Sequence, residues 1–425
     1  MNSQVSVKDQ YRTSRIMYII EAMVENFISI LTAGAYLATL TRAIGISDSM
    51  TAVLSALTSL SGLFQVFTIL VAHKTPVKGW VIPLQILAHL MLCGLYLIPL
   101  FGLGRHASIL FLLLILGANG IKSFKSSVKI NWFMSMVEPK NRGSYSGILT
   151  AVSVVSSLFF SIGASYVFDS FIAAGNERGA FAVISVTILV LIVLDAIPLF
   201  ISKEKPTDMR RITSPLSSVK ELMANRSFRT LLIISTVQAA ATGIAPPFLS
   251  TYQINELGFS LSFIALTDII VNAVWVCALL GFGHLSRRLP YERIMHLSVI
   301  IQALTFGALI FVVPANGRIL FTVYRCLSMV CGSASAVSLN NLVFDLVPET
   351  QRTSALAVRT VFTGTISFVV TISVTPLFES LQAKRITLLG TELYAQQFLA
   401  ICTFSIILVV NILWLIYGRR MRVEH

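Results

Sequence analysis

The sequence predicts an all-α membrane protein with twelve transmembrane helices in two six-helix halves, and three observations lead to that fold class. Hydrophobic residues make up 55% of the chain and charged residues only 12%, about half the charged share of an ordinary soluble domain. Apolar windows of roughly 20 residues, the length that crosses about 30 Å of hydrocarbon, follow one another with short breaks. Short motifs of the first half also recur in the second.

The apolar windows give the expected spans in order. The first window is too long for the apolar core of a signal peptide and contains Glu21 and Glu25, so we interpret it as span 1. Later windows are separated by short connections that leave no room for a catalytic domain outside the membrane. The twelve spans are expected at approximately 16–40, 50–72, 79–101, 107–134, 144–168, 180–202, 229–252, 260–283, 294–313, 317–346, 354–378 and 396–418.

A polar stretch at 203–228 divides the spans into two groups of six. It is rich in basic residues and contains Pro206 and Pro215, a composition typical of a linker. The expected organisation is therefore an N-terminal half at 1–202, the basic linker, and a C-terminal half at 229–425.

The distribution of Lys and Arg predicts the orientation of the chain. With both termini in the cytoplasm, the inside connections and tails carry 21 of the 32 basic residues, the outside connections six and the spans five. Cytoplasmic loops are enriched in Lys and Arg, so we expect this orientation in an inner or plasma membrane. The net charge of +13 then reflects topology and attraction to anionic lipid, and nucleic acid is not needed as a partner.

Two cytoplasmic corners show that the halves are copies of one unit. Residues 137–144 read VEPKNRGS and residues 347–354 read VPETQRTS, with Arg142 and Arg352 at equivalent positions. A second pair of corners repeats at nearly the same offset, with basic residues and a proline at 73–76 and 287–290. Such parallel repeats of six spans are one way in which transporters build a cavity with alternating access.

With twelve spans and a central basic loop, these corners resemble the major facilitator superfamily. The second copy matches the family's corner well, with Asp345 at its acidic position and Arg352 at its arginine, whereas the first copy has Ser135 at the acidic position. The corner after span 8 has Arg287 where the family usually has aspartate. The resemblance implies secondary transport, a protein that is usually monomeric, and a central cavity lined by the first and fourth spans of each half.

Charged residues at helical spacing mark two spans of the first half. Glu21 and Glu25 share one face of span 1, and Lys122, Lys125 and Lys129 share one face of span 4 together with Asn119. At 1.5 Å per residue, Glu25 and Lys125 both lie about 14 Å, and Glu21 and Lys129 about 8 Å, from the cytoplasmic edge. The sequence therefore predicts two ion pairs, while Lys122, at about 18 Å, has no carboxylate of span 1 at its level.

The role of these two stripes stays open at this point. Their residues could bind the solute and couple its transport to a proton, or they could form a structural network that joins spans 1 and 4. Lys125 and Lys129 could gate the cavity, or they could extend to the interface by snorkelling.

The second half has a different set of polar residues. In span 7, Gln238 precedes Pro246 and Pro247, which should kink or break the helix, free backbone carbonyls near the cavity and form a hinge. Asp268 in span 8 lies one turn from Asn272, a spacing that suits either a buried polar pair or a titrating site.

Two arginines complete the set. Arg325 in span 10 is a candidate ligand, and Arg359 in span 11 is a candidate gate residue or structural ion-pair partner, as are Arg142, Arg352 and Asp345 at the corners.

The balance of charges inside the spans favours an anionic solute. We count five basic residues against three acidic ones, which favours a carboxylate, an acidic sugar or an organophosphate. In this hypothesis the chain is a proton-coupled secondary transporter. Lys122 and Arg325, with Asn119 and Gln238, bind the solute, and Glu21, Glu25 or Asp268 carries the proton.

The sequence leaves three alternative functions open. The same fold could export amphipathic or cationic drugs, with the glutamates as ligands, or it could serve as a receptor or scaffold that transports nothing. An enzyme is the least favoured class, because no nucleotide-binding loop, zinc-protease motif or nucleophile elbow occurs. The five cysteines lack the spacing of metal ligands, so no cofactor or metal is expected.

Overall fold

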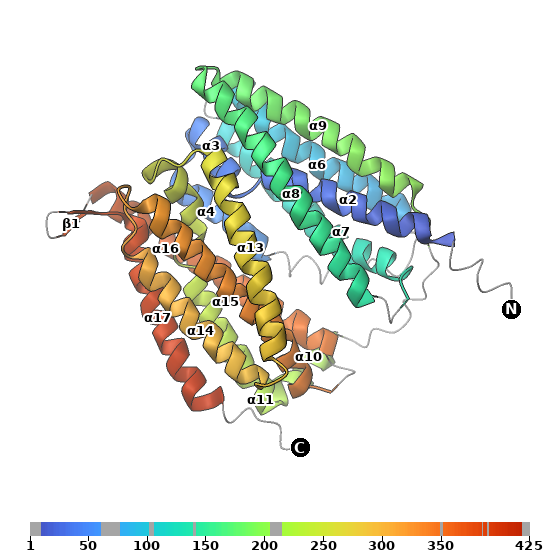
Figure 1. The fold of residues 1–425 in the computed structure, drawn as a ribbon, viewed down its shortest axis with the longest axis vertical. Coiled ribbons are helices and arrows are strands. Elements are labelled where there is room, and N and C mark those ends of the chain that lie inside the picture. The colour runs from blue at the N-terminus through green and yellow to red at the C-terminus, as the bar shows by residue number, and fades with distance from the viewer. Residues whose placement is uncertain are drawn as a thin grey trace. The chain divides into compact units, whose positions relative to one another are not determined.

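A computed structural model describes residues 10–60, 77–101, 106–138, 142–204, 215–348, 352–384, 386–388 and 391–418. Nearly all of these residues are helical (Figure 1). Ten helices in this part of the chain are long and apolar enough to cross a membrane. The predicted all-α membrane fold is therefore confirmed.

The contacts within the chain define two compact units, and the first contains residues 1–47, 63–211 and 260–265. Span 1 is broken at Thr32 and Ala33, where the backbone turns before Gly34 with φ +55°. The helices of this unit are α2 (Arg12–Leu31), α3 (Gly34–Ala43), α6 (Lys78–Phe101), α7 (His106–Met134), α8 (Arg142–Ala173) and α9 (Glu177–Ile201).

The second unit contains residues 48–62, 212–259 and 266–425. It begins with the first part of span 2, in α4 (Asp48–Ala56) and η1 (Leu57–Leu60); the rest of that span, with the corner at 73–76, lies outside the described residues. The long helices are α11 (Arg226–Thr242), α13 (Leu261–Leu285), α14 (Tyr291–Leu309), α15 (Gly317–Leu346), α16 (Arg352–Lys384) and α17 (Ala395–Tyr417).

Two short elements were not expected from the sequence. The linker contains the helix α10 (Pro215–Ala224), and an antiparallel hairpin of β1 (Ile386–Leu388) and β2 (Thr391–Leu393) connects α16 to α17. The division into halves at 1–202 and 229–425 stays a prediction, since the compact units assign residues 48–62 differently.

An apolar core brings together four helices of the first unit. The ring of Tyr18 on α2 stacks on Phe133 of α7 with centroids 4.1 Å apart, and Phe133 stacks on Trp132 at 4.5 Å. Val81 of α6 and Leu199 of α9 complete this core. The packing fixes α2, α6, α7 and α9 against each other one turn from the charged residues of spans 1 and 4.

The helix of span 7 breaks where the proline pair predicts. Helix α11 ends at Thr242, Gly243 follows as its C-cap, and Pro246 begins the short 3-10 helix η3 (Pro246–Phe248). The chain continues through α12 (Leu249–Thr251) and a π-helical turn, η4 (Tyr252–Glu256).

The carbonyls at this break are not left open, contrary to the expectation from the sequence. Thr371 of α16 donates to the carbonyl of Gly243 at 2.7 Å, and Thr403 of α17 donates to that of Ala241 at 3.2 Å. The hydroxyl of Thr371 thus takes the place of the helical donor that Pro247 lacks, whereas the Ala241 carbonyl also accepts from the backbone of Ile244. A hinge at Pro246 and Pro247 remains a prediction.

Gly243 is required where α11 meets α16. A Cβ at this position would lie 2.5 Å from the carbonyl oxygen of Ser367, closer than packed atoms approach. We expect Gly243→Ala to destabilise the protein by about 1–3 kcal/mol and to lower its thermal unfolding midpoint. Gly281→Ala is the control, because a Cβ there meets nothing within 4 Å. Equal midpoints for the two variants would contradict this packing.

Candidate functional site

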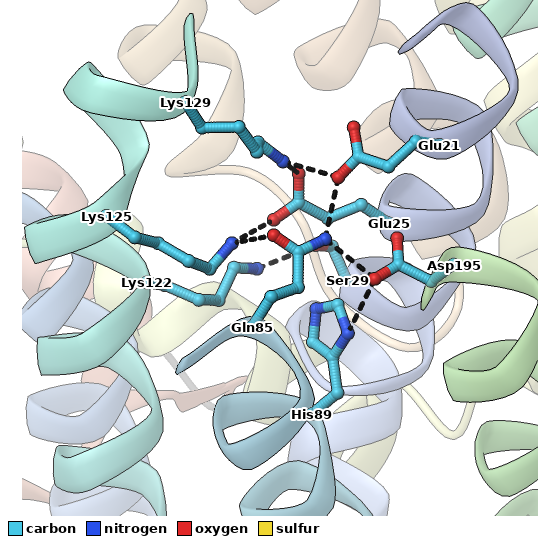
Figure 2. A network of polar contacts seen from close by, with 9 residues as sticks. All are labelled: Glu21, Glu25, Ser29, Gln85, His89, Lys122, Lys125, Lys129 and Asp195. Carbon is cyan, nitrogen blue, oxygen red and sulfur yellow. Dashed lines mark hydrogen bonds and ion pairs between the residues drawn. The ribbon is translucent and has the colours of Figure 1, made fainter. Parts of the chain in front are cut away.

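The candidate site lies inside the first unit, where one face of α2 meets α7. Glu21 is 0% exposed, and Lys125 and Lys129 are 1% and 4% exposed. Charged side chains this deeply buried require partners, because an isolated charge in an apolar interior is strongly unfavourable. The partners come from four helices, α2, α6, α7 and α9, whose side chains converge on one point (Figure 2).

The two ion pairs predicted from helix depth are both present. Lys129 Nζ lies 2.6 Å from Glu21 Oε1, and Lys125 Nζ lies 3.0 Å from Glu25 Oε1. A third contact was not predicted: Lys129 also lies 2.5 Å from Glu25 Oε2. Each oxygen of the Glu25 carboxylate thus accepts from a different lysine (Figure 2).

Gln85 of α6 connects this ionic group to α9, and sequence reasoning missed it. Its carbonyl oxygen accepts from Lys125 at 2.5 Å. Its amide nitrogen donates to Glu21 Oε1 at 2.6 Å and to Asp195 Oδ2 at 2.7 Å. Because a side-chain amide has one accepting and one donating end, these partners fix its orientation. Gln85 therefore connects Lys125 to two carboxylates through one side chain.

Asp195 and His89 extend the group further, and both were also missed. Asp195 on α9 is 1% exposed and His89 on α6 is 0% exposed. His89 Nδ1 lies 3.3 Å from Asp195 Oδ2, an ion-pair distance when the ring is protonated. We call the connected residues the ionic cluster: Glu21, Glu25, Gln85, His89, Lys125, Lys129 and Asp195.

Asp195 corrects the count of charges inside the spans. It lies in the apolar window of span 6 and is missing from the sequence count, although a carboxylate in such a window is itself the signal. With Asp195 included, the same count gives five basic residues against four acidic ones. The excess of positive charge, on which the anion hypothesis rests, is smaller than the sequence count gave.

Lys122 has surroundings unlike those of the other two lysines. It lies half-buried one turn before Lys125 and donates to Ser29 Oγ at 2.9 Å. Within the described residues no carboxylate lies at ion-pair distance from it, as the depth argument predicted. Asn119, the other expected ligand of this stripe, donates to the carbonyl of Ile115 in its own helix.

In the second unit the expected ligand Arg325 is already paired. Its guanidinium contacts the Asp268 carboxylate and lies 3.3 Å from Thr267 Oγ1. Asn272 donates to the backbone carbonyl of residue 268 and not to its side chain, so of the two alternatives a titrating role of Asp268 stays a prediction. Asp268 is therefore the ion-pair partner of Arg325 in this structure.

The remaining expected residues belong to other helices. Gln238 of α11 donates to Gln302 of α14 at 2.7 Å. Arg359 is half-buried in α16, and Asp345 is exposed near the end of α15. Arg142 and Arg352 begin α8 and α16, and their side chains lie outside the described part of the structure. The gate roles of these residues stay predictions.

No group of His, Cys, Asp or Glu in the described residues is arranged to hold a metal ion. The five cysteines are free thiols, two of them buried. What the site can do chemically is bind charge and exchange protons.

The ten long apolar helices of the described residues define a class of protein: a multi-pass membrane protein. The sequence profile of the Major Facilitator Superfamily matches residues 16–372. The chain belongs to this superfamily.

Solved structures of transporters share the fold. The structure is similar to that of a mutant of the nucleoside transporter NupG, with a TM-score of 0.71, 13% identity, and coverage of 95% of this chain and 99% of that one. It is also similar to a bacterial homologue of the iron transporter ferroportin in the inward-facing state (TM-score 0.68, 16% identity, 98% and 100% coverage) and to a D-xylose–proton symporter (0.68, 14%, 95% and 98%). A comparison with curated proteins finds no match.

The buried ion pairs make the first unit sensitive to loss of a single charge. Lys129→Met leaves Glu21 with no lysine and Glu25 with only Lys125. Breaking a buried pair costs about 3–5 kcal/mol, so the thermal midpoint of the purified protein should fall markedly. The double variant Lys129→Met/Glu21→Gln should recover part of the loss, since it removes the unpaired carboxylate.

Lys203→Met is the matched control, because Lys203 is exposed. A Lys129→Met protein with the midpoint of this control would show that the ion pairs do not stabilise the unit.

Proposed function

We propose that the chain is a secondary active transporter that works by alternating access and moves a small organic anion together with a proton. The solute is a carboxylate, an acidic sugar or an organophosphate. Membership of a transporter superfamily supports the general part of this proposal. The anion and the proton rest on the residues of the first unit.

One observation carries the proposal, namely the different surroundings of three lysines on one helix face. Lys125 and Lys129 are neutralised by glutamates, whereas Lys122 meets only the hydroxyl of Ser29 among the described residues. A half-buried ammonium with no carboxylate in direct contact attracts an anion, since Coulomb attraction is much stronger there than in water. Lys122 is therefore our candidate for the group that binds the solute.

Arg325 and Gln238 are weaker candidates for ligands than the sequence suggested. Each side chain has a partner of its own, Asp268 and Gln302 respectively. To bind a solute, Arg325 has to leave Asp268, which would then be free to take up a proton. Asp268 therefore stays a candidate coupling residue, which exchanges its ion pair with Arg325 for a proton.

The ionic cluster is our candidate for the coupling site. Glu21 and Glu25 supply carboxylates, and both are held by lysines of α7. Buried ionisable groups inside a membrane commonly mark proton pathways, because an unneeded buried charge is too costly to keep.

The distribution of basic residues supports placement in the plasma or inner membrane with both termini in the cytoplasm. The corners with Arg142 and Arg352 then face the cytoplasm, where we propose that they gate the cavity.

Export of a cationic or amphipathic compound is the second candidate. One observation favours it: the Glu25 side chain is 20% exposed, so a cation can reach it. In that case the glutamates bind the solute and Lys122 is dispensable.

Thermal shift measurements on the purified full-length protein separate the two candidates. The probes are lactate, glucuronate and glycerol 3-phosphate as anions, glucose as a neutral control, and tetraphenylphosphonium as a cation. We expect at least one anion to raise the unfolding midpoint of the wild type, because a ligand that binds only the folded state stabilises it. Lys122→Met should lose this stabilisation, and Lys203→Met should keep it.

Stabilisation by an anion that persists in Lys122→Met would contradict the assignment of Lys122. Stabilisation by tetraphenylphosphonium that persists in Lys122→Met and disappears in Glu25→Gln would replace our proposal with cation export.

A further inference from the structure

His89 and Asp195 form the least satisfied part of the ionic cluster. Neither ring nitrogen of His89 has a hydrogen-bond partner among the described residues, and Asp195 Oδ1 has none either. Both side chains are fully buried, so water does not replace the missing partners at the surface. Buried polar groups in proteins are nearly always hydrogen-bonded, and an exception calls for an explanation.

The net charge of the ionic cluster explains why these groups lack partners. The ionic cluster holds three carboxylates, Glu21, Glu25 and Asp195, against two ammonium groups, Lys125 and Lys129. With its three carboxylates ionised and His89 neutral, it therefore carries one net negative charge. Lys122 lies one helical turn from Lys125 and balances this charge from outside the hydrogen-bonded group.

Binding of an anion to Lys122 upsets this balance. The anion cancels the charge of Lys122, so the buried cluster is left with one uncompensated negative charge. A low-dielectric interior strongly disfavours such a charge, and uptake of one proton removes it.

We propose that His89 and Asp195 together form the proton-binding site of this transporter, and that anion binding at Lys122 drives proton uptake there. The coupling to an anion rests on the proposed function, whereas the assignment of the proton-binding site does not. A hydronium ion of the solvent supplies the proton: its O–H bond breaks, an N–H bond forms at Nδ1 of the imidazole, and a water molecule is left. Nδ1 lies 3.3 Å from Asp195 Oδ2.

The groups around His89 favour this site over its neighbours. On α6 itself, the thiol of Cys93 contacts Ser185 and the hydroxyl of Tyr96 donates to the carbonyl of Leu31. Asp195 faces the ring from α9, and Gln85 joins it to Glu21 of α2 and Lys125 of α7. Glu25 and Lys129 also face the cluster, Tyr18 of α2 lies near both of them, and Lys122 lies one helical turn from Lys125.

Glu25 is the poorest proton acceptor of the three carboxylates. Both its oxygens accept from lysines, so protonation would break two ion pairs. Glu21 is the main competitor, since its Oε2 has no partner among the described residues. His89 differs from Glu21 because it gains an ion pair when it is protonated, whereas Glu21 loses one.

Gln85 explains how the two ends of the cluster communicate. Its amide oxygen accepts from Lys125 and its amide nitrogen donates to Asp195, so one side chain joins the lysines of α7 to the pair of His89 and Asp195. Proton uptake and anion binding therefore favour each other, which is the thermodynamic requirement for symport.

The test needs no solute, because Lys122→Gln removes the same charge that a bound anion cancels. Full-length protein with isotope-labelled histidine is titrated between pH 5 and 8 by NMR, and the His89 signal is assigned by its loss in His89→Gln. In Lys122→Gln we expect the proton affinity of His89 to rise on the order of tenfold. A tenfold change corresponds to about 1.4 kcal/mol, the order of magnitude of the interaction between two unit charges in a partly buried site.

Lys122→Arg and Lys203→Gln are the controls. The first keeps the charge at the site, and the second removes a charge from an exposed lysine. Both should titrate as the wild type does. Lactate, glucuronate or glycerol 3-phosphate added to the wild type should reproduce the effect of Lys122→Gln.

The outcomes separate this inference from the proposed function. An unchanged His89 titration in Lys122→Gln overturns the inference, even if an anion still binds at Lys122. The same holds if infrared difference spectra place the added proton on a carboxyl group while His89 stays neutral. A raised His89 affinity in Lys122→Gln, with no effect of the three anions on the wild type, supports the proton site and counts against these anions as solutes.

Discussion

The need to balance buried charge governs the first unit of this protein. Three carboxylates and two lysines lie together among four helices that otherwise present apolar side chains. Taking these groups out of water costs several kcal/mol each, and the attraction between them offsets this cost only while each keeps its partners. The arrangement of α2, α6, α7 and α9 is therefore tied to the state of the cluster. A change of one charge anywhere in it has consequences for the whole group.

This constraint connects structure with transport. A cluster that was fully paired and neutral would serve only to hold helices together. Here the balance depends on Lys122, which is half-buried and bonded to a hydroxyl rather than to a carboxylate. A solute that neutralises Lys122 leaves the negative charge of the cluster uncompensated without touching the cluster. Alternating access requires such a link, because the solute and the proton must influence the same helices.

The sequence was sufficient to predict the fold and half of the site. Helix rise per residue is constant, so depth arithmetic placed Glu21 opposite Lys129 and Glu25 opposite Lys125. The break at Pro246 followed equally from local chemistry, because proline lacks the donor that a helix needs. These features depend on one helix or on a simple relation between two.

The rest of the site depends on how helices rotate against each other, which a single sequence does not reveal. Gln85, His89 and Asp195 lie in spans 3 and 6, and the buried face of these strongly apolar spans cannot be read from periodicity. The pairing of Arg325 with Asp268 and the hydrogen bond from Thr371 to the Gly243 carbonyl were missed for the same reason.

Proton uptake on solute binding tests the central claim most directly. One of the anions glucuronate, lactate and glycerol 3-phosphate that stabilises the protein is added to the purified wild type in weakly buffered solution. A pH indicator then reports the number of protons that the protein takes up. The charge balance predicts uptake of about one proton per protein for a monoanion, and none in His89→Gln. Solute binding with no proton uptake by the wild type would contradict the account.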